Sequence, residues 1–159
     1  MQTKLNTPIL YLLLLLLSSV TLAAEPVSKS SFGGVAIGGH DTVAYHEQTP
    51  DQHLAAKGKG SYVVEWKGAK WRFATLADSE TFAANPEKYS PAYNGFCANS
   101  LSLGKGLLKT DGSHWRIFDD QLFLFYAQKG EDRWTAGDYA EYKHLADRAW
   151  QDILVGEEN

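Results

Sequence analysis

The chain has 159 residues, a formal net charge of −4 and 13% aromatic residues, including five tryptophans. A mildly acidic chain without a stripe of Lys and Arg argues against a nucleic-acid-binding protein. Cys97 is the only cysteine, which excludes an internal disulfide and leaves four roles for this side chain. These roles are a buried inert residue, a partner in an intermolecular disulfide, a metal ligand and a reactive thiol.

The first 24 residues have the three-part layout of a signal peptide. Lys4 supplies a positive start, residues 9–17 are almost entirely leucine, and residues 18–24 are mostly small. The apolar run is shorter than the about 20 residues that a membrane span needs, and an uncleaved membrane anchor is the alternative. We predict cleavage after Ala23 or Ala24, a periplasmic or secreted protein, and no stable membrane insertion after cleavage.

The next part of the chain predicts a linker, three strands and a helix. Residues 25–31 are largely polar and favour a mobile linker. Runs of aromatic and β-branched residues favour strands, and residues 67–69 provide the turn of a hairpin. Thr75 and Asp78 fit a capping box at the start of a helix that Asn85-Pro86 ends. The predicted strands are residues 42–46, 61–66 and 70–74, and the predicted helix is residues 76–84.

The second half predicts another hairpin and two further helices. Residues 95–103 favour a short helix that Gly104 and Gly106 stop, and Asp138 with Glu141 caps a final helix. The predicted hairpin consists of residues 114–118 and 121–126, the final helix is residues 139–154, and residues 155–159 are predicted to be a disordered tail. Because strands and helices do not alternate, we predict an α+β fold of small antiparallel hairpins flanked by short helices, with a C-terminal helix.

Several separated motifs give the chain a specific resemblance to the YHS domain family. The motifs are Trp71-Arg72-Phe73, Phe82, residues 85–89 (Asn-Pro-Glu-Lys-Tyr), residues 40–45 (His-Asp-Thr-Val-Ala-Tyr), residues 93–98 (Tyr-Asn-Gly-Phe-Cys-Ala), Trp115-Arg116-Ile117 and Trp150. Residues 32–154 resemble a longer, secreted subgroup of that family. The resemblance implies an α+β fold and, for the short members of the family, soft-metal binding through cysteines.

The chain departs from the family at the cysteines themselves. The cysteines of the short family members align with Ala44, Ala74 and Asp78 in this sequence. Alanine cannot ligate a metal, and Asp78 is already expected to cap a helix. A metal site in this chain must therefore use other residues.

We predict a metal site that consists of Cys97 and His40, with Asp41 as a third ligand or as an orienting partner of the imidazole. Thiolate and imidazole together suit copper or zinc, the two candidate cofactors. Gly38-Gly39 precedes His40 and lets the chain bend toward another segment. The function predicted from this site is soft-metal binding or handling without turnover, in a periplasmic or secreted protein whose partner is a metal ion.

Three alternatives stay open. An imidazolium beside Cys97 would favour the reactive thiolate, which makes the chain a thiol-dependent oxidoreductase with Cys97 as its nucleophile. The resembling subgroup includes selenocysteine at this position, which fits redox chemistry as well as metal binding. Cys97 between Phe96 and Ala98 also fits a small buried hydrophobe. Finally, the chain could be a non-catalytic binding module for an unknown protein partner.

Overall fold

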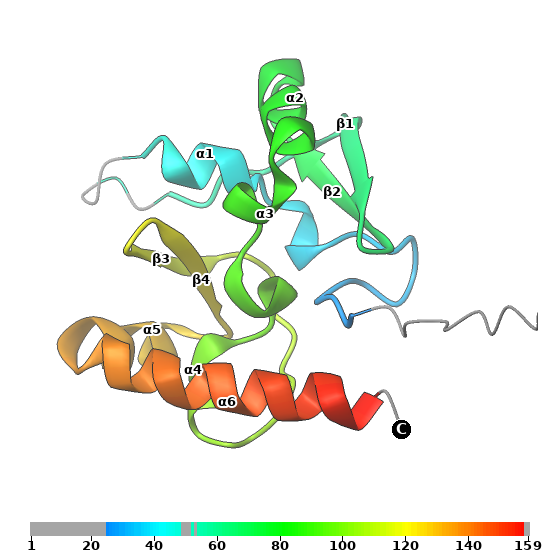
Figure 1. Ribbon diagram of the computed structural model, residues 1–159. Coiled ribbons are helices and arrows are strands. Elements are labelled where there is room, and N and C mark those ends of the chain that lie inside the picture. Colours follow the sequence, from blue (N-terminus) through cyan, green and yellow to red (C-terminus); the bar gives the residue numbers. More distant parts are fainter. Residues whose placement is uncertain (1–24, 49–51, 53, 158–159) are drawn as a thin grey trace, which may run out of the picture.

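The computed structural model describes residues 25–48, 52 and 54–157, and it has the mixed α+β architecture that the sequence predicts (Figure 1). Two antiparallel hairpins are surrounded by helices, of which the long C-terminal one runs along one side of the molecule. Within the described ranges, none of the helices combines the length and the apolar character needed to cross a bilayer. The elements are η1 (Ile37–Gly39), α1 (Thr42–His46), β1 (Lys59–Trp66), β2 (Ala69–Phe73), α2 (Leu76–Ala84), α3 (Pro86–Tyr89), η2 (Ala92–Gly95), α4 (Ala98–Ser102), β3 (His114–Phe118), β4 (Gln121–Phe125), α5 (Gln128–Ala136) and α6 (Tyr139–Glu157).

Both predicted hairpins are confirmed, and both turn through two residues in the left-handed region. Lys67 and Gly68 have φ values of 48° and 67° between β1 and β2. Asp119 and Asp120 have φ values of 48° and 61° between β3 and β4. Two successive left-handed residues match the twist of an antiparallel pair, and Asp and Gly are among the residues that tolerate this conformation.

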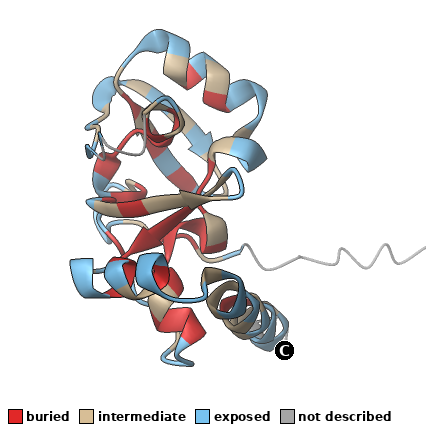
Figure 2. Cartoon of the chain, turned by 90° about the vertical axis from the view of Figure 1, so that its left-hand side faces the viewer, coloured by how far each residue is buried: buried red, intermediate tan, exposed pale blue. Residues whose placement is uncertain are grey.

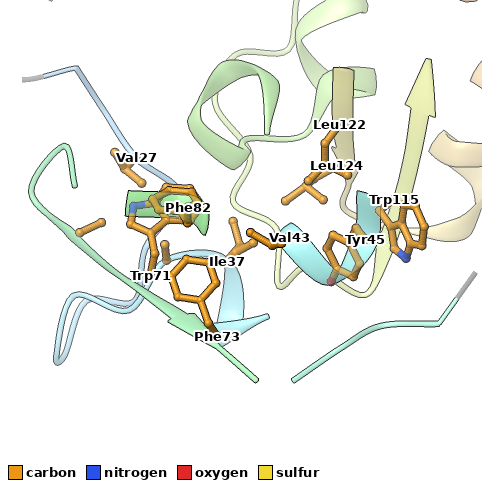
Figure 3. Close-up of a cluster of buried hydrophobic side chains, with 12 residues drawn as sticks. Val27, Ile37, Val43, Tyr45, Trp71, Phe73, Phe82, Trp115, Leu122 and Leu124 are labelled. Carbon is orange, nitrogen blue, oxygen red and sulfur yellow. The ribbon is translucent and has the colours of Figure 1, made fainter. Parts of the chain in front are cut away.

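Strand β4 lies between the two hydrophobic clusters of the protein and is buried on both faces (Figure 2). Leu122 and Leu124 point into the first cluster, which also contains Trp71, Phe73 and Phe82 (Figure 3). Phe123 and Phe125 belong to the second cluster, which α4, α5 and α6 cover. Successive side chains of a strand point to opposite faces, so this short strand joins the two halves of the core.

The predicted helices at residues 76–84 and 139–154 are confirmed, and each begins at the expected cap. Thr75 Oγ1 accepts a hydrogen bond from the Asp78 backbone N–H at 3.1 Å. Asp138 Oδ1 accepts hydrogen bonds from the N–H groups of Ala140 and Glu141, both at 3.1 Å. Such bonds satisfy N–H groups that have no partner inside the helix. The short helix expected within residues 95–103 is α4.

The predicted strand at residues 42–46 is wrong, because these residues form helix α1. Valine, threonine and tyrosine favour strands, but Asp41 stands in front of them as an N-cap. Its side chain accepts from the backbone N–H groups of Val43 and Ala44, which stabilises the first helical turn. A buried cap has therefore overridden the local strand preference.

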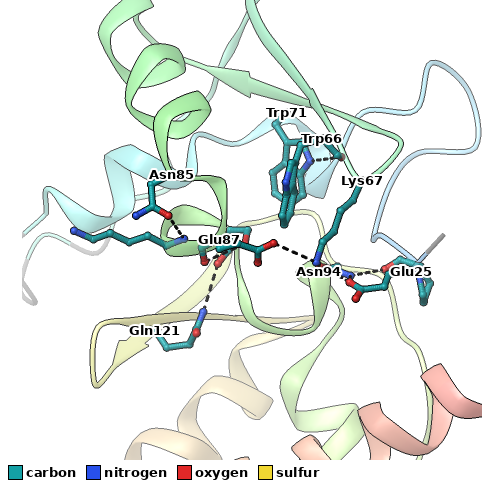
Figure 4. Close-up of polar contacts among 11 residues, drawn as sticks. Glu25, Trp66, Lys67, Trp71, Asn85, Glu87, Asn94 and Gln121 are labelled. Atoms are coloured by element: carbon teal, nitrogen blue, oxygen red, sulfur yellow. Dashed lines mark hydrogen bonds and ion pairs between the residues drawn. The ribbon is translucent and has the colours of Figure 1, made fainter. Parts of the chain in front are cut away.

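The predicted mobile linker and disordered tail are also corrected. Val27 and Ser28, within the expected linker of residues 25–31, are buried, and the Ser28 N–H donates to the Asn94 carbonyl oxygen. Glu25 pairs with Lys67 at 2.6 Å (Figure 4). At the other end, α6 continues to Glu157, so residues 155–157 are helical. The predicted signal peptide, residues 1–24, and residues 158–159 lie outside the described residues.

Candidate functional site

Asp41, which the sequence proposed as a third metal ligand, holds two segments of backbone together. The residue is fully buried, and its Oδ1 accepts from the N–H groups of Val43 at 2.9 Å and Ala44 at 3.1 Å. Its Oδ2 accepts from the Ala74 N–H at 2.7 Å. Burial raises the pKa of this carboxyl to about 6, and the nearby Asp78 carboxyl adds to the effect. Asp41 therefore caps α1 and anchors the end of β2.

Ala44, Ala74 and Asp78 meet at Asp41. Ala44 and Ala74 donate their backbone N–H groups to its carboxylate, and Asp78 is its charged neighbour. The space between these positions is occupied by a carboxylate whose two oxygens both accept hydrogen bonds.

His40 is a core residue packed against Gly112. Only 3% of its surface is exposed, and a Cβ at Gly112 would lie 2.8 Å from its Nδ1. The ring stacks on Tyr45, whose hydroxyl donates to the Gly112 carbonyl oxygen at 2.6 Å. Burial lowers the pKa of His40, and the positive charge of Lys57 lowers it further. The bend that Gly38-Gly39 permits thus carries His40 into the core.

Cys97 lies in the other half of the molecule, at the N-terminal end of α4. Its Sγ accepts two backbone hydrogen bonds, from Ser100 N–H at 3.4 Å and from Tyr126 N–H at 3.3 Å. Its own N–H donates to the Leu108 carbonyl oxygen at 2.9 Å. These contacts fix the sulfur between the first turn of α4 and the residue that follows β4.

The residues before Cys97 hold it in place through an unusual stretch of backbone. Tyr93, Asn94 and Gly95 have φ values of 56°, 48° and 85°, a left-handed run that is uncommon for residues other than glycine. A Cβ at Gly95 would lie 2.4 Å from Cγ2 of Ile37, so only glycine fits. The Asn94 side chain donates to Glu25 at 3.1 Å (Figure 4), and the Tyr93 hydroxyl donates to Asp147 at 2.9 Å.

Cys97 borders a pocket of about 430 Å³ between α4, the end of β4 and α5, a volume typical of small-molecule sites. The lining residues are Cys97, Asn99, Ser100, Leu103, Lys105, Leu108, Tyr126, Ala127, Lys129, Gly130 and Arg133. Helix α5 is fixed beside the pocket by Glu131, which is fully buried and pairs with Arg116 of β3 at 2.9 Å. Three of the lining residues carry positive charge, and none carries negative charge.

Arg133 is the most firmly held of these cations. Its Nη1 donates to Asn99 Oδ1 at 2.9 Å and to Ser102 Oγ at 3.0 Å. Its guanidinium lies 3.6 Å from the ring centre of Tyr142, within the range of a cation–π contact. These partners are neutral, so they orient the guanidinium without cancelling its charge.

The structure does not bring the three predicted metal ligands together. Among the described residues there is no group of three or more His, Cys, Asp or Glu side chains arranged to hold a metal ion. His40 contacts Ile37, and Asp41 accepts a hydrogen bond from Ala74, so both lie beside the first hydrophobic cluster. Cys97 instead contacts Ser100, Leu108 and Tyr126. Apart from Cys97, the uncharged polar residues that line the pocket offer a copper or zinc ion only amide, hydroxyl and phenol oxygens as ligands.

Comparisons with protein-family models, with curated proteins and with solved structures find no match to the chain. The resemblance to YHS domains therefore stays a prediction. Sequence reasoning selected Cys97 but missed the cations around it. Lys129 and Arg133 lie on α5, a helix whose N-cap residue Ala127 makes no side-chain cap, so the usual sequence pattern of a helix start is absent.

Proposed function

We propose that Cys97 is a reactive thiol and that the protein is an exported, thiol-dependent reductase of hydroperoxides. The observation that carries this proposal is the pair of backbone N–H groups that donate to Sγ beside a cationic pocket. Reactive cysteines are found in electropositive surroundings that stabilise the thiolate. The leucine-rich start of the chain supports export. The predicted alternative, a thiol nucleophile, thereby takes precedence over the predicted metal site.

The chemistry follows from the small exposure of the sulfur. Cys97 is 3% exposed, which favours a small oxidant such as a hydroperoxide over a large disulfide. The thiolate attacks one peroxide oxygen, the O–O bond breaks, and hydroxide or alkoxide leaves, so that Cys–S⁻ and ROOH give Cys–SOH and RO⁻. Sulfenic acid is the first and reversible step of cysteine oxidation.

Restoration of Cys97 needs a thiol from another molecule, because the chain has no second cysteine. An external thiol RSH condenses with Cys–SOH to give Cys–S–SR and water. A second RSH then attacks the mixed disulfide, which releases RSSR and returns the cysteine thiol. Over one cycle, one hydroperoxide is reduced and two external thiols are oxidised.

A turnover assay tests this proposal. The protein is mixed with hydrogen peroxide and an excess of a small thiol, and peroxide loss is followed beside a thiol-only control. We expect many equivalents of peroxide to be consumed per protein, and Cys97→Ser to reduce the rate to that of the control. If wild type and Cys97→Ser are equally slow, Cys97 has no peroxidase role.

Titration of Cu(I) into wild type and Cys97→Ser tests the metal hypothesis. The thiol proposal expects no tight binding of one equivalent of Cu(I), since no second soft ligand lines the pocket. Tight binding of one equivalent that Cys97→Ser abolishes would instead support metal handling. His40→Ala shows whether the imidazole takes part.

A further inference from the structure

We infer that the pocket beside Cys97 selects thiol-reactive molecules that carry a negative charge, such as organic carboxylates. This inference rests on the proposed function, because it names the substrate class of the same site. The pocket of about 430 Å³ is far larger than hydrogen peroxide, so it has room for an organic hydroperoxide or for the external thiol. Its charge then decides which of these molecules approach the sulfur.

The charge around the pocket is opposite in sign to that of the whole chain. The chain carries a formal net charge of −4, yet the charged residues that line the pocket are Lys105, Lys129 and Arg133. An anion gains from all three, and a cleft lined by one sign of charge concentrates ligands of the other sign.

The acids next to these cations do not line the pocket. Glu131 of α5 forms an ion pair with Arg116 of β3. The Asp132 carboxylate keeps its charge, because its hydrogen bond at 2.8 Å comes from the neutral Gln128. Arg133 is held by Asn99, Ser102 and Tyr142, all of them neutral. Its charge therefore remains available to a ligand.

Apolar side chains complete the pocket and strengthen the effect of the cations. Leu103, Leu108 and Tyr126 line it although they are 45%, 40% and 62% exposed. Exposed apolar residues gathered at a pocket are typical of a ligand site. A bound molecule covered by them displaces water, and charges interact more strongly where water is excluded.

The test compares two alkylating agents that differ in charge. Iodoacetate is an anion and iodoacetamide is neutral, and both react by the same displacement, in which the thiolate sulfur bonds to the CH₂ carbon and iodide leaves. The rate of Cys97 modification is measured by intact mass for each agent at low salt. The ratio of the two rates is divided by the same ratio for mercaptoethanol, a thiol without charged neighbours.

We expect the normalised ratio to favour iodoacetate by about tenfold, since each of three cations at a partly exposed site contributes roughly two- to threefold. Lys129→Gln and Lys105→Gln should each lower the ratio by about that factor, and Arg133→Gln by at least as much. Arg148→Gln is the matched control, because Arg148 is exposed on α6 and does not line the pocket. Added salt should also lower the ratio.

The outcomes separate the inference from the proposed function. A normalised ratio near one, with Cys97 readily alkylated by iodoacetamide, overturns the charge selection and leaves the reactive thiol in place. Failure of both agents to modify Cys97 overturns the proposed function, and the inference falls with it. Arg133→Gln could fail to fold because Asn99 and Ser102 lose their partner. In that case the Lys105 and Lys129 variants still test the charge selection, since both lysines are exposed.

Discussion

Replacement of Asp41 by alanine is expected to lower the free energy of unfolding by about 3–4 kcal/mol, measured by urea denaturation. The change removes the acceptor of three backbone N–H groups, those of Val43, Ala44 and Ala74. A buried donor without a partner costs about 1–3 kcal/mol, and relief of the buried carboxylate offsets part of the sum. The expected loss exceeds that for an ordinary helix cap.

Thr75→Ala is the matched control for this prediction. Thr75 is also an N-cap, but it is exposed and its Oγ1 accepts a single backbone hydrogen bond, from Asp78. A loss of about 1 kcal/mol is typical of such a cap. Equal losses for the two variants would mean that Asp41 acts only as a cap of α1 and does not also anchor β2.

Phe82→Ala is expected to destabilise the fold by about 3–5 kcal/mol, the usual cost of removing a buried phenyl group. Phe82 is fully buried, and its ring lies 4.9 Å from Phe73, 5.5 Å from Trp71 and 5.9 Å from Trp66, measured between ring centroids. Figure 3 shows Phe82 beside Trp71 and Phe73 in the first cluster.

The control on the same helix is Leu76→Ala. Leu76 is 57% exposed at the first turn of α2, and exposed substitutions of this kind change stability by about 0.5 kcal/mol or less. Chemical denaturation of both variants beside wild type gives the comparison. A loss below about 1 kcal/mol for Phe82→Ala would contradict the packing of α2 on the first hairpin.

The sequence predicts most of the regular structure because its cues are local. Each hairpin follows from strand-forming residues around a two-residue turn, and the helices at residues 76–84 and 139–154 follow from capping residues that precede an apolar pattern. Helix α1 could not be predicted, because its cap, Asp41, accepts hydrogen bonds from three N–H groups and one of them, that of Ala74, is distant in sequence. Its five residues are too few to show a helical period.

The candidate site is less predictable because it depends on tertiary packing. Cys97 stands out in the sequence as a single cysteine, and that part of the site could be predicted. The pairing with His40 could not be judged, because nothing local tells whether the bend at Gly38-Gly39 leads toward Cys97 or into the core beside Gly112. Likewise, Arg133 lies on α5, and this helix is placed by tertiary contacts such as the ion pair of the buried Glu131 with Arg116 of β3.

The most direct test of Cys97 as a reactive thiol compares the folded protein with the protein unfolded in urea. Each is treated with the same concentration of hydrogen peroxide in the presence of dimedone, which traps sulfenic acid, and the adduct on Cys97 is followed by mass spectrometry. If the two backbone N–H groups and the pocket cations activate the sulfur, the folded protein reacts about tenfold faster or more. Faster reaction of the unfolded protein would contradict the account, because the fold would then protect Cys97 as an inert core residue.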